Sequence, residues 1–303
     1  MNPDLLPLAL GINRVILYSG YVLLAGTFTF WSLVWPQGRK DRHLLILSIA
    51  GIALTTIATV AGPMIDIWIA GMTWAEVFSP ISAAALFVRL AALAAAAFFL
   101  VDIVNYPIAS WRRALPLTIV VAIAATMVAS SNAVGGPWEV VKLVATMGHV
   151  IATAAWLGGL VALAAVLIPR QYLAELDKVI PRFSIIAATS VVVLLVTGTL
   201  HALAIAGGFQ ELVTSDYGIV FFIKVAIFGA MLLMGNHGRK YANGVALRAA
   251  AAARASKEAK INHDKLTKGG PGMHSLAVAM GAELAIAFGI LLTTSLLVFV
   301  APH

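Results

Sequence analysis

Two histidines lie deep inside long apolar stretches of this chain of 303 residues. His149 lies about ten residues below one end of the stretch 141–168, and His201 lies about seven residues below the end of the stretch 183–207. As antiparallel neighbours, these stretches bring the two imidazoles to a similar depth. Met147 precedes His149 by two residues, and imidazole with thioether is a ligand set that suits Cu(I). We interpret His149, His201 and Met147 as a candidate metal site.

The same imidazoles also fit a different ligand. Either His149 or His201 can be the axial ligand of a b-type haem. The second nitrogen of a liganding imidazole is usually held by a hydrogen bond from a neighbouring group. Thr153, one turn after His149, and Thr197, one turn before His201, are predicted to supply such bonds. A hydrogen-bonded histidine with only a packing role is the remaining interpretation.

Arg89 and Lys224 are charged residues at matching depths in two other apolar stretches, about eight residues from the side on which the histidines lie. An ionisable side chain at the bilayer centre costs at least about 2.5–3.5 kcal/mol and normally faces the bundle interior. Both residues are therefore predicted to point inward. In a haem site they pair with the propionates, whereas in a copper site their positive charges oppose the cation.

Glu283 lies about eight residues into the last apolar stretch, counted from the opposite side. Met280 precedes it by three residues, and residues at this spacing share a helix face. A carboxylate at that depth needs a cation, a proton or a lysine as its partner. We expect Glu283 and Met280 to serve the cytoplasmic exit of a transport path.

The composition indicates that a bilayer, and not water, surrounds most of these residues. The chain is 61% hydrophobic and 11% charged, whereas soluble domains carry about 25% charged residues. It has no cysteine, which excludes thiolate ligands and disulfides. We predict an all-α polytopic membrane protein with eight transmembrane helices of about 20 residues. The predicted spans are 13–35, 44–62, 81–104, 114–133, 141–168, 183–207, 217–236 and 275–300.

Basic residues are concentrated in alternate connections between the predicted spans. Sixteen of the twenty Lys and Arg residues follow spans one, three, five and seven, and eight of these lie in the connection 237–274. By the positive-inside rule these connections are cytoplasmic, so both termini are predicted to lie outside the cytoplasm. The net charge of +7 therefore reflects topology, and no nucleic acid is expected as a partner.

An internal repeat is visible in the apolar stretches. The segment Leu86–Leu90 aligns with Phe221–Val225 at an offset of 135, which pairs Arg89 with Lys224. Ala25-Gly26 aligns with Gly158-Gly159 at an offset of 133. Transporter folds use such repeats and often place their site between the halves. The predicted four-helix halves, related as a parallel repeat, are residues 1–135 and 136–303.

The motifs of the second half resemble those of a known family. The stretch 149–160 contains the pattern His…Trp-Leu-Gly-Gly-Leu, and Pro-Arg-Phe-Ser follows at 181–184. Thr-Gly at 197–198, Tyr-Gly before Lys at 217–224, and His-Ser before Glu at 274–283 continue in order. These residues resemble the copper-resistance D (CopD) family of integral membrane proteins, and the resemblance covers about residues 139–302.

The resemblance implies eight membrane helices and a role in moving copper across the bacterial inner membrane, often beside a periplasmic copper-binding protein. One departure concerns the outer loop before span five, where family members often carry further histidines. Here that loop, residues 130–137, reads Ser-Ser-Asn-Ala-Val-Gly-Gly-Pro. Capture of copper from outside is therefore the part of the family's function that these residues support least.

We therefore expect a multi-pass inner-membrane protein that imports copper, held as Cu(I), and we favour a transporter over an enzyme. Its expected partners are the copper ion, the lipid bilayer and a periplasmic copper-binding protein. The alternative is a membrane redox protein that binds haem b or a porphyrin, because the His, Trp, Gly-Leu and Lys pattern is also similar to the HemJ-type protoporphyrinogen oxidases. A structural membrane subunit, whose buried charges are merely paired, is the third interpretation.

Overall fold

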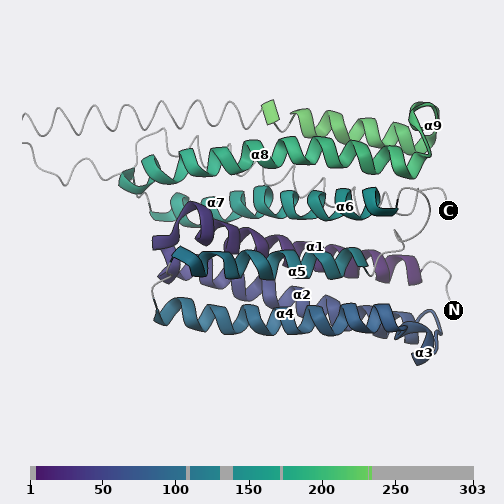
Figure 1. Cartoon of the computed structure of the whole chain (residues 1–303), viewed down its shortest axis with the longest axis horizontal. Helices are drawn as coiled ribbons and strands as arrows, with labels where there is room; N and C mark the ends of the chain where they lie inside the picture. Colours follow the sequence, from purple (N-terminus) through teal and green to yellow (C-terminus); the bar gives the residue numbers. More distant parts are fainter. Residues whose placement is uncertain (1–4, 107–109, 130–138, 171–172, 231, 234–303) are drawn as a thin grey trace, which may run out of the picture.

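The computed structural model describes residues 5–106, 110–129, 139–170, 173–230 and 232–233. Within these residues every regular element is a helix, and the long helices run side by side in an elongated bundle (Figure 1). The predicted all-α membrane class is therefore confirmed, while the count of eight spans and their orientation stay predictions. Five helical segments of the described part are long and apolar enough to cross a membrane, namely Leu5–Val34, Arg42–Trp68, Pro80–Asn105, Glu139–Val166 and Val179–Ala206.

The helices follow one another with short connections. In the first part of the chain they are α1 (Leu5–Thr29), η1 (Phe30–Val34), η2 (Pro36–Lys40), α2 (Arg42–Trp68), α3 (Trp74–Val77), α4 (Pro80–Asn105), η3 (Ser110–Arg113) and α5 (Ala114–Ala129). In the second part they are α6 (Glu139–Thr153), η4 (Ala154–Gly158), α7 (Gly159–Arg170), α8 (Leu173–Ala206) and α9 (Phe209–Thr214), and residues 216–230 are helical. The predicted span 275–300 and the predicted loop 237–274 lie outside the described residues.

Two helices extend past the prolines that were expected to mark the ends of spans. The second span was expected to end at residue 62, but α2 continues through Pro63 to Trp68. The sixth was expected to begin at residue 183, but α8 begins at Leu173 and contains Pro181. A proline removes a single N–H donor, and membrane helices tolerate this loss where packed neighbours and side chains compensate it.

The connection between α2 and α4 is a short capped turn. Thr73 and Glu76 form a capping box at the start of α3, in which each side chain bonds the other residue's backbone N–H. Trp68 and Trp74 flank this turn and are exposed. Exposed tryptophans at helix ends are typical of the membrane interface. The turn therefore marks one end of the bundle.

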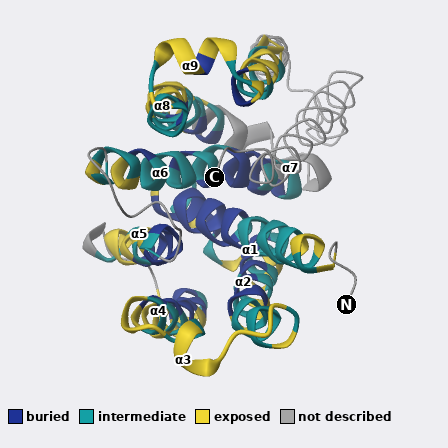
Figure 2. Cartoon of the chain, turned by 90° about the vertical axis from the view of Figure 1, so that its right-hand side faces the viewer, coloured by how far each residue is buried: buried dark blue, intermediate teal, exposed yellow. Residues whose placement is uncertain are grey.

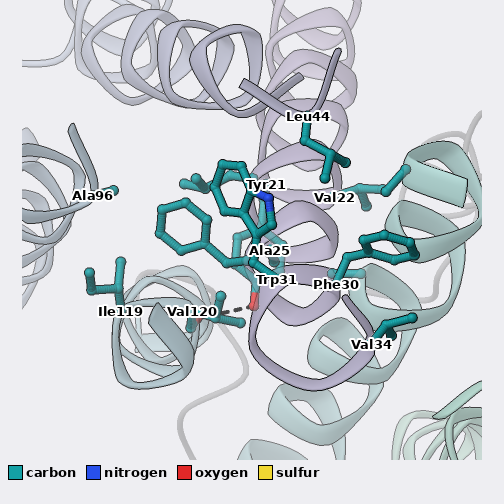
Figure 3. Packing of buried hydrophobic residues seen from close by; sticks show 14 of the residues in the cluster. Tyr21, Val22, Ala25, Phe30, Trp31, Val34, Leu44, Ala96, Ile119 and Val120 are labelled. Atoms are coloured by element: carbon teal, nitrogen blue, oxygen red, sulfur yellow. Dashed lines mark hydrogen bonds between the residues drawn. The ribbon is translucent and has the colours of Figure 1, made fainter. Parts of the chain in front are cut away.

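The core is centred on α1, which lies in the middle of the bundle (Figure 2). Its side chains Tyr21 and Phe28 are fully buried, and the Tyr21 hydroxyl donates to the carbonyl of Val120 on α5 at 3.1 Å (Figure 3). Between α1 and α2 the packing depends on small residues and hydroxyls. The Ser48 hydroxyl donates to Thr27 Oγ1 at 2.8 Å. Such close, hydrogen-bonded contacts are characteristic of helix association in membranes.

The opposite end of the bundle gathers the basic connections. The segment η1 contacts η2 and η3, and it also contacts α8. There Arg182 Nη1 donates to the carbonyl of Val34 at 3.3 Å, and Arg112 forms an ion pair with Asp102. The described basic connections therefore meet at the end of the molecule away from α3, as the charge pattern predicts for one common side of the membrane.

Candidate functional site

The two candidate histidines lie on adjacent antiparallel helices, α6 and α8 (Figure 1). His149 Nδ1 on α6 is 3.2 Å from Thr197 Oγ1 on α8. His201 Nδ1 on α8 is 3.0 Å from Thr146 Oγ1 on α6. Each helix therefore contributes one histidine and one threonine to a reciprocal pair of hydrogen bonds. His149 and Thr146 are three residues apart, so the two bonds are about one helical turn apart along the interface.

Two glycines permit the close approach of α6 and α8. A Cβ placed on Gly198 would lie 3.2 Å from Cε1 of His149, and one placed on Gly148 would lie 3.2 Å from Cγ2 of Thr197. Both distances are tighter than ordinary contact. Small residues allow membrane helices to pack backbone against side chain in this way. The His149 ring therefore lies directly over the α8 backbone, with little room to rotate.

The hydrogen bonds of Thr197 determine which tautomer of His149 fits. The Thr197 hydroxyl donates its single hydrogen to the carbonyl of Val193 at 2.6 Å. Its oxygen can then only accept from the ring, so the neutral imidazole carries its hydrogen on Nδ1. This tautomer leaves the lone pair of Nε2 for a ligand.

The Lys224 ammonium lies close enough to interact electrostatically with both imidazoles. His149 and His201 also interact with each other. Lys224 is partly buried and follows the start of the helix 216–230 by eight residues. The structure thus brings together His149, His201 and Lys224, and the positive charge beside the imidazoles opposes a bound cation, as expected from the sequence.

Met147 and Trp156 pack against different parts of the molecule. Residues two positions apart point about 200° away from each other on an α-helix, so Met147 and His149 occupy different faces of α6. Met147 packs against the main hydrophobic core around α1. Trp156 packs edge to face on Phe228, with ring centroids 5.3 Å apart. Met147 therefore packs in the core, and Trp156 packs against the helix that carries Lys224.

A π-helical turn follows His149, and the sequence did not indicate it. The turn η4 spans Ala154–Gly158, which is the Ala-Ala-Trp-Leu-Gly part of the motif. Thr153, which was expected to bond an imidazole, instead donates to the backbone carbonyl of His149 at 2.8 Å. That expectation is wrong, since a threonine inside a helix readily bonds the carbonyl four residues before it. Single π-turns occur frequently at functional sites.

Arg89 is buried inside the first part of the bundle, between α4 and α5. Its Nε donates to Thr126 Oγ1 at 2.9 Å and its Nη2 donates to the Thr126 carbonyl at 2.8 Å. It also interacts electrostatically with Tyr18, which in turn interacts with Arg14. The inward orientation expected for Arg89 from the cost of facing lipid is therefore confirmed.

The offset that relates Arg89 to Lys224 extends to two further pairs. The same offset relates Arg14 to His149 and Asp66 to His201. Arg14 and Asp66 interact electrostatically with each other, as the two histidines do. The first part of the chain thus carries charged residues at positions that match the imidazoles and the ammonium of the second part. The offset itself was seen in the sequence, but its extension to these two further pairs was missed.

Two ligands alone do not complete a metal cage. Among the residues that the structure describes, no group of three or more His, Cys, Asp or Glu side chains converges on one point. Glu283 and Met280 lie outside the described residues. The donors at hand are the two imidazoles, which suit copper better than hard cations. The described residues therefore offer two imidazole ligands and do not form a complete metal site.

Residues 177–297 match the family model described as Copper resistance protein D. The matched range includes Thr197, His201 and Lys224, and it begins after α6, which carries His149. No curated protein and no solved structure matches the chain. The family resemblance predicted from the sequence is therefore confirmed over these residues.

Proposed function

We propose that this chain, which carries a copper resistance protein D region at residues 177–297, imports copper across the bacterial inner membrane. The observation that carries the proposal is the reciprocal pairing of His149 with Thr197 and of His201 with Thr146, between two helices long enough to span a bilayer. Polar side chains at that depth are costly and mark ion pathways.

Copper is the metal that these donors favour. The chain has no cysteine, and imidazole is a good ligand for copper in either oxidation state. Cu(I) accepts few ligands, which agrees with a site that offers two imidazoles. Met147 remains a proposed third ligand, although it packs against the core. The Lys224 charge weakens cation binding, and a transport site must release its ion as well as bind it.

The proposed topology gives the copper path an entry side and an exit side. We place eight spans in two four-helix halves, residues 1–135 and 136–303, with both termini outside the cytoplasm. Copper would then enter from the side of α3 and α9, with or without a periplasmic copper-binding protein. It would leave past Met280 and Glu283, in the segment outside the described residues.

Copper binding by the purified full-length protein tests this function. We expect copper bound by the wild type to be lost in His149→Ala and in His201→Ala, with both variants still inserted and monodisperse. The His43→Ala variant, at the exposed start of α2, is the matched control and keeps its copper. A Soret band in the visible spectrum would instead select the haem alternative. Lower copper accumulation in cells that express the chain would contradict import.

A further inference from the structure

We propose that Thr197 and Thr146 are positioning residues that hold the histidines by Nδ1, so that copper is bound through Nε2 of each ring. This inference rests on the proposed copper site. Thr197 and Thr146 act through the imidazoles and do not touch the metal.

Both hydrogen-bond partners of Thr197 beside His149 are defined. Its hydroxyl hydrogen goes to the Val193 carbonyl and its oxygen faces His149 Nδ1. A free imidazole exchanges between two tautomers, but this threonine accepts only from Nδ1–H. The ring is therefore prepared for metal binding before copper arrives. Hydrogen bonds of this kind fix the tautomer and the orientation of liganding histidines.

The same contact between a threonine hydroxyl and Nδ1 recurs at His201 with the roles of the helices exchanged. Thr146 Oγ1 occupies Nδ1 of His201, so Nδ1 of each ring faces the opposite helix and not a ligand. The interface is further confined at Gly148 and Gly198, where an added Cβ would be in tight contact with the opposite helix. A carboxylate would hold the rings more strongly, but it would add a charge to the site. A threonine holds them without trapping the cation.

The test compares Thr197→Val with Thr197→Ser in the purified full-length protein, by competition for Cu(I) with a chromophoric chelator. Loss of the hydroxyl is expected to weaken Cu(I) binding by about 10–100-fold, the usual effect of removing such a partner. The serine variant keeps the hydroxyl and should bind like the wild type. Thr153→Val is the matched control, since its hydroxyl bonds the backbone of His149 and not the ring. Thr146→Val tests the second ring, should Thr197→Val fail to fold.

A second measurement follows the tautomer without copper. Nitrogen NMR of isotope-labelled histidine should show His149 protonated at Nδ1 in the wild type and in Thr197→Ser, and a mixture of tautomers in Thr197→Val. Equal copper affinity in the valine variant and the wild type, or equal loss in the valine and serine variants, would overturn the inference. Full copper binding by His149→Ala would overturn the proposed function itself, and this separates the two failures.

Discussion

Gly26 of α1 and Gly158 of η4 are in backbone contact, so the two helices cross with no side chain between them. A Cβ on Gly158 would overlap the Val22 carbonyl and lie 2.6 Å from the Cα of Gly26. The neighbouring Gly159 lies under the ring of Phe183 on α8. The two glycines of the motif therefore have different partners, α1 for the first and α8 for the second. Together they fix η4 between the core and the candidate site.

Substituting Gly158 by Ala should destabilise the protein. The added methyl group has no free volume at the crossing, and overpacking of this kind costs about 1–3 kcal/mol. Thermal unfolding in detergent, followed by loss of the monodisperse peak, measures the effect. Gly229→Ala is the matched control, because a Cβ there meets no atom of the described residues within 4 Å. An unchanged melting temperature for Gly158→Ala would show that α1 and η4 can move apart freely.

Substituting Thr126 by Val should destabilise the first part of the bundle. Arg89 would keep its buried charge but lose the acceptor at Thr126 Oγ1. A hydrogen bond to a charged group contributes about 1.5–3 kcal/mol, and the Thr126 carbonyl still accepts from Nη2. We therefore expect a loss near the lower end, about 1.5 kcal/mol. Thr118→Val, on the same helix and exposed, should have no measurable effect. Equal melting of both variants would mean that Thr126 does not support Arg89.

Cysteines introduced at the two ends of the bundle test the orientation. Ala75 is exposed on α3, and Gln37 is exposed on η2 beside the basic residues. The chain has no native cysteine, so each variant carries a single thiol. The positive-inside rule places η2 in the cytoplasm. A membrane-impermeant thiol reagent applied to intact cells should label Ala75→Cys and spare Gln37→Cys. The reverse pattern would invert the proposed topology and the direction of the copper path.

Much of the candidate site could be predicted from the sequence, because the alternation of spans places His149 and His201 on antiparallel neighbours. The similar depth of the two histidines in their spans then predicts that their side chains lie near each other. Thr197 was correctly expected to bond an imidazole. Thr153 was not, because a helix offers its own carbonyl as a nearer partner. Met147 was chosen by proximity in sequence, whereas helix phase directs it to the core.

The helix ends and the π-turn could be predicted less well, for a common reason. Pro63 and Pro181 end helices in the local pattern, yet neighbouring helices stabilise α2 and α8 through these positions. The π-helical turn at Ala154–Gly158 likewise does not change the pattern of hydrophobic residues in the sequence. Its glycine contact with α1 depends on a residue far away in the sequence. Tertiary packing, and not local propensity, determines these features.

Substituting Lys224 by Met should tighten the binding of copper. The ammonium interacts electrostatically with both imidazoles and opposes a cation there. At an effective dielectric constant of about 20, the repulsion between two unit charges is about 4 kcal/mol at about 4 Å and halves when the distance doubles. Removing one of them should raise the Cu(I) affinity roughly ten- to thirtyfold. Chelator competition measures this change, and Lys224→Arg, which keeps the charge, should remain close to the wild type.

The sign of this effect separates the two ligand hypotheses. In the haem alternative Lys224 pairs with a propionate, so Lys224→Met would lower the amount of haem that stays bound during purification. In the copper site the same change strengthens retention of the metal and slows its release from loaded vesicles. Lys40→Met, in η2 at the opposite end of the bundle, controls for the loss of a positive charge alone. Weaker copper binding by Lys224→Met would show that this lysine does not repel the bound copper. Its charge could then not promote release of the ion.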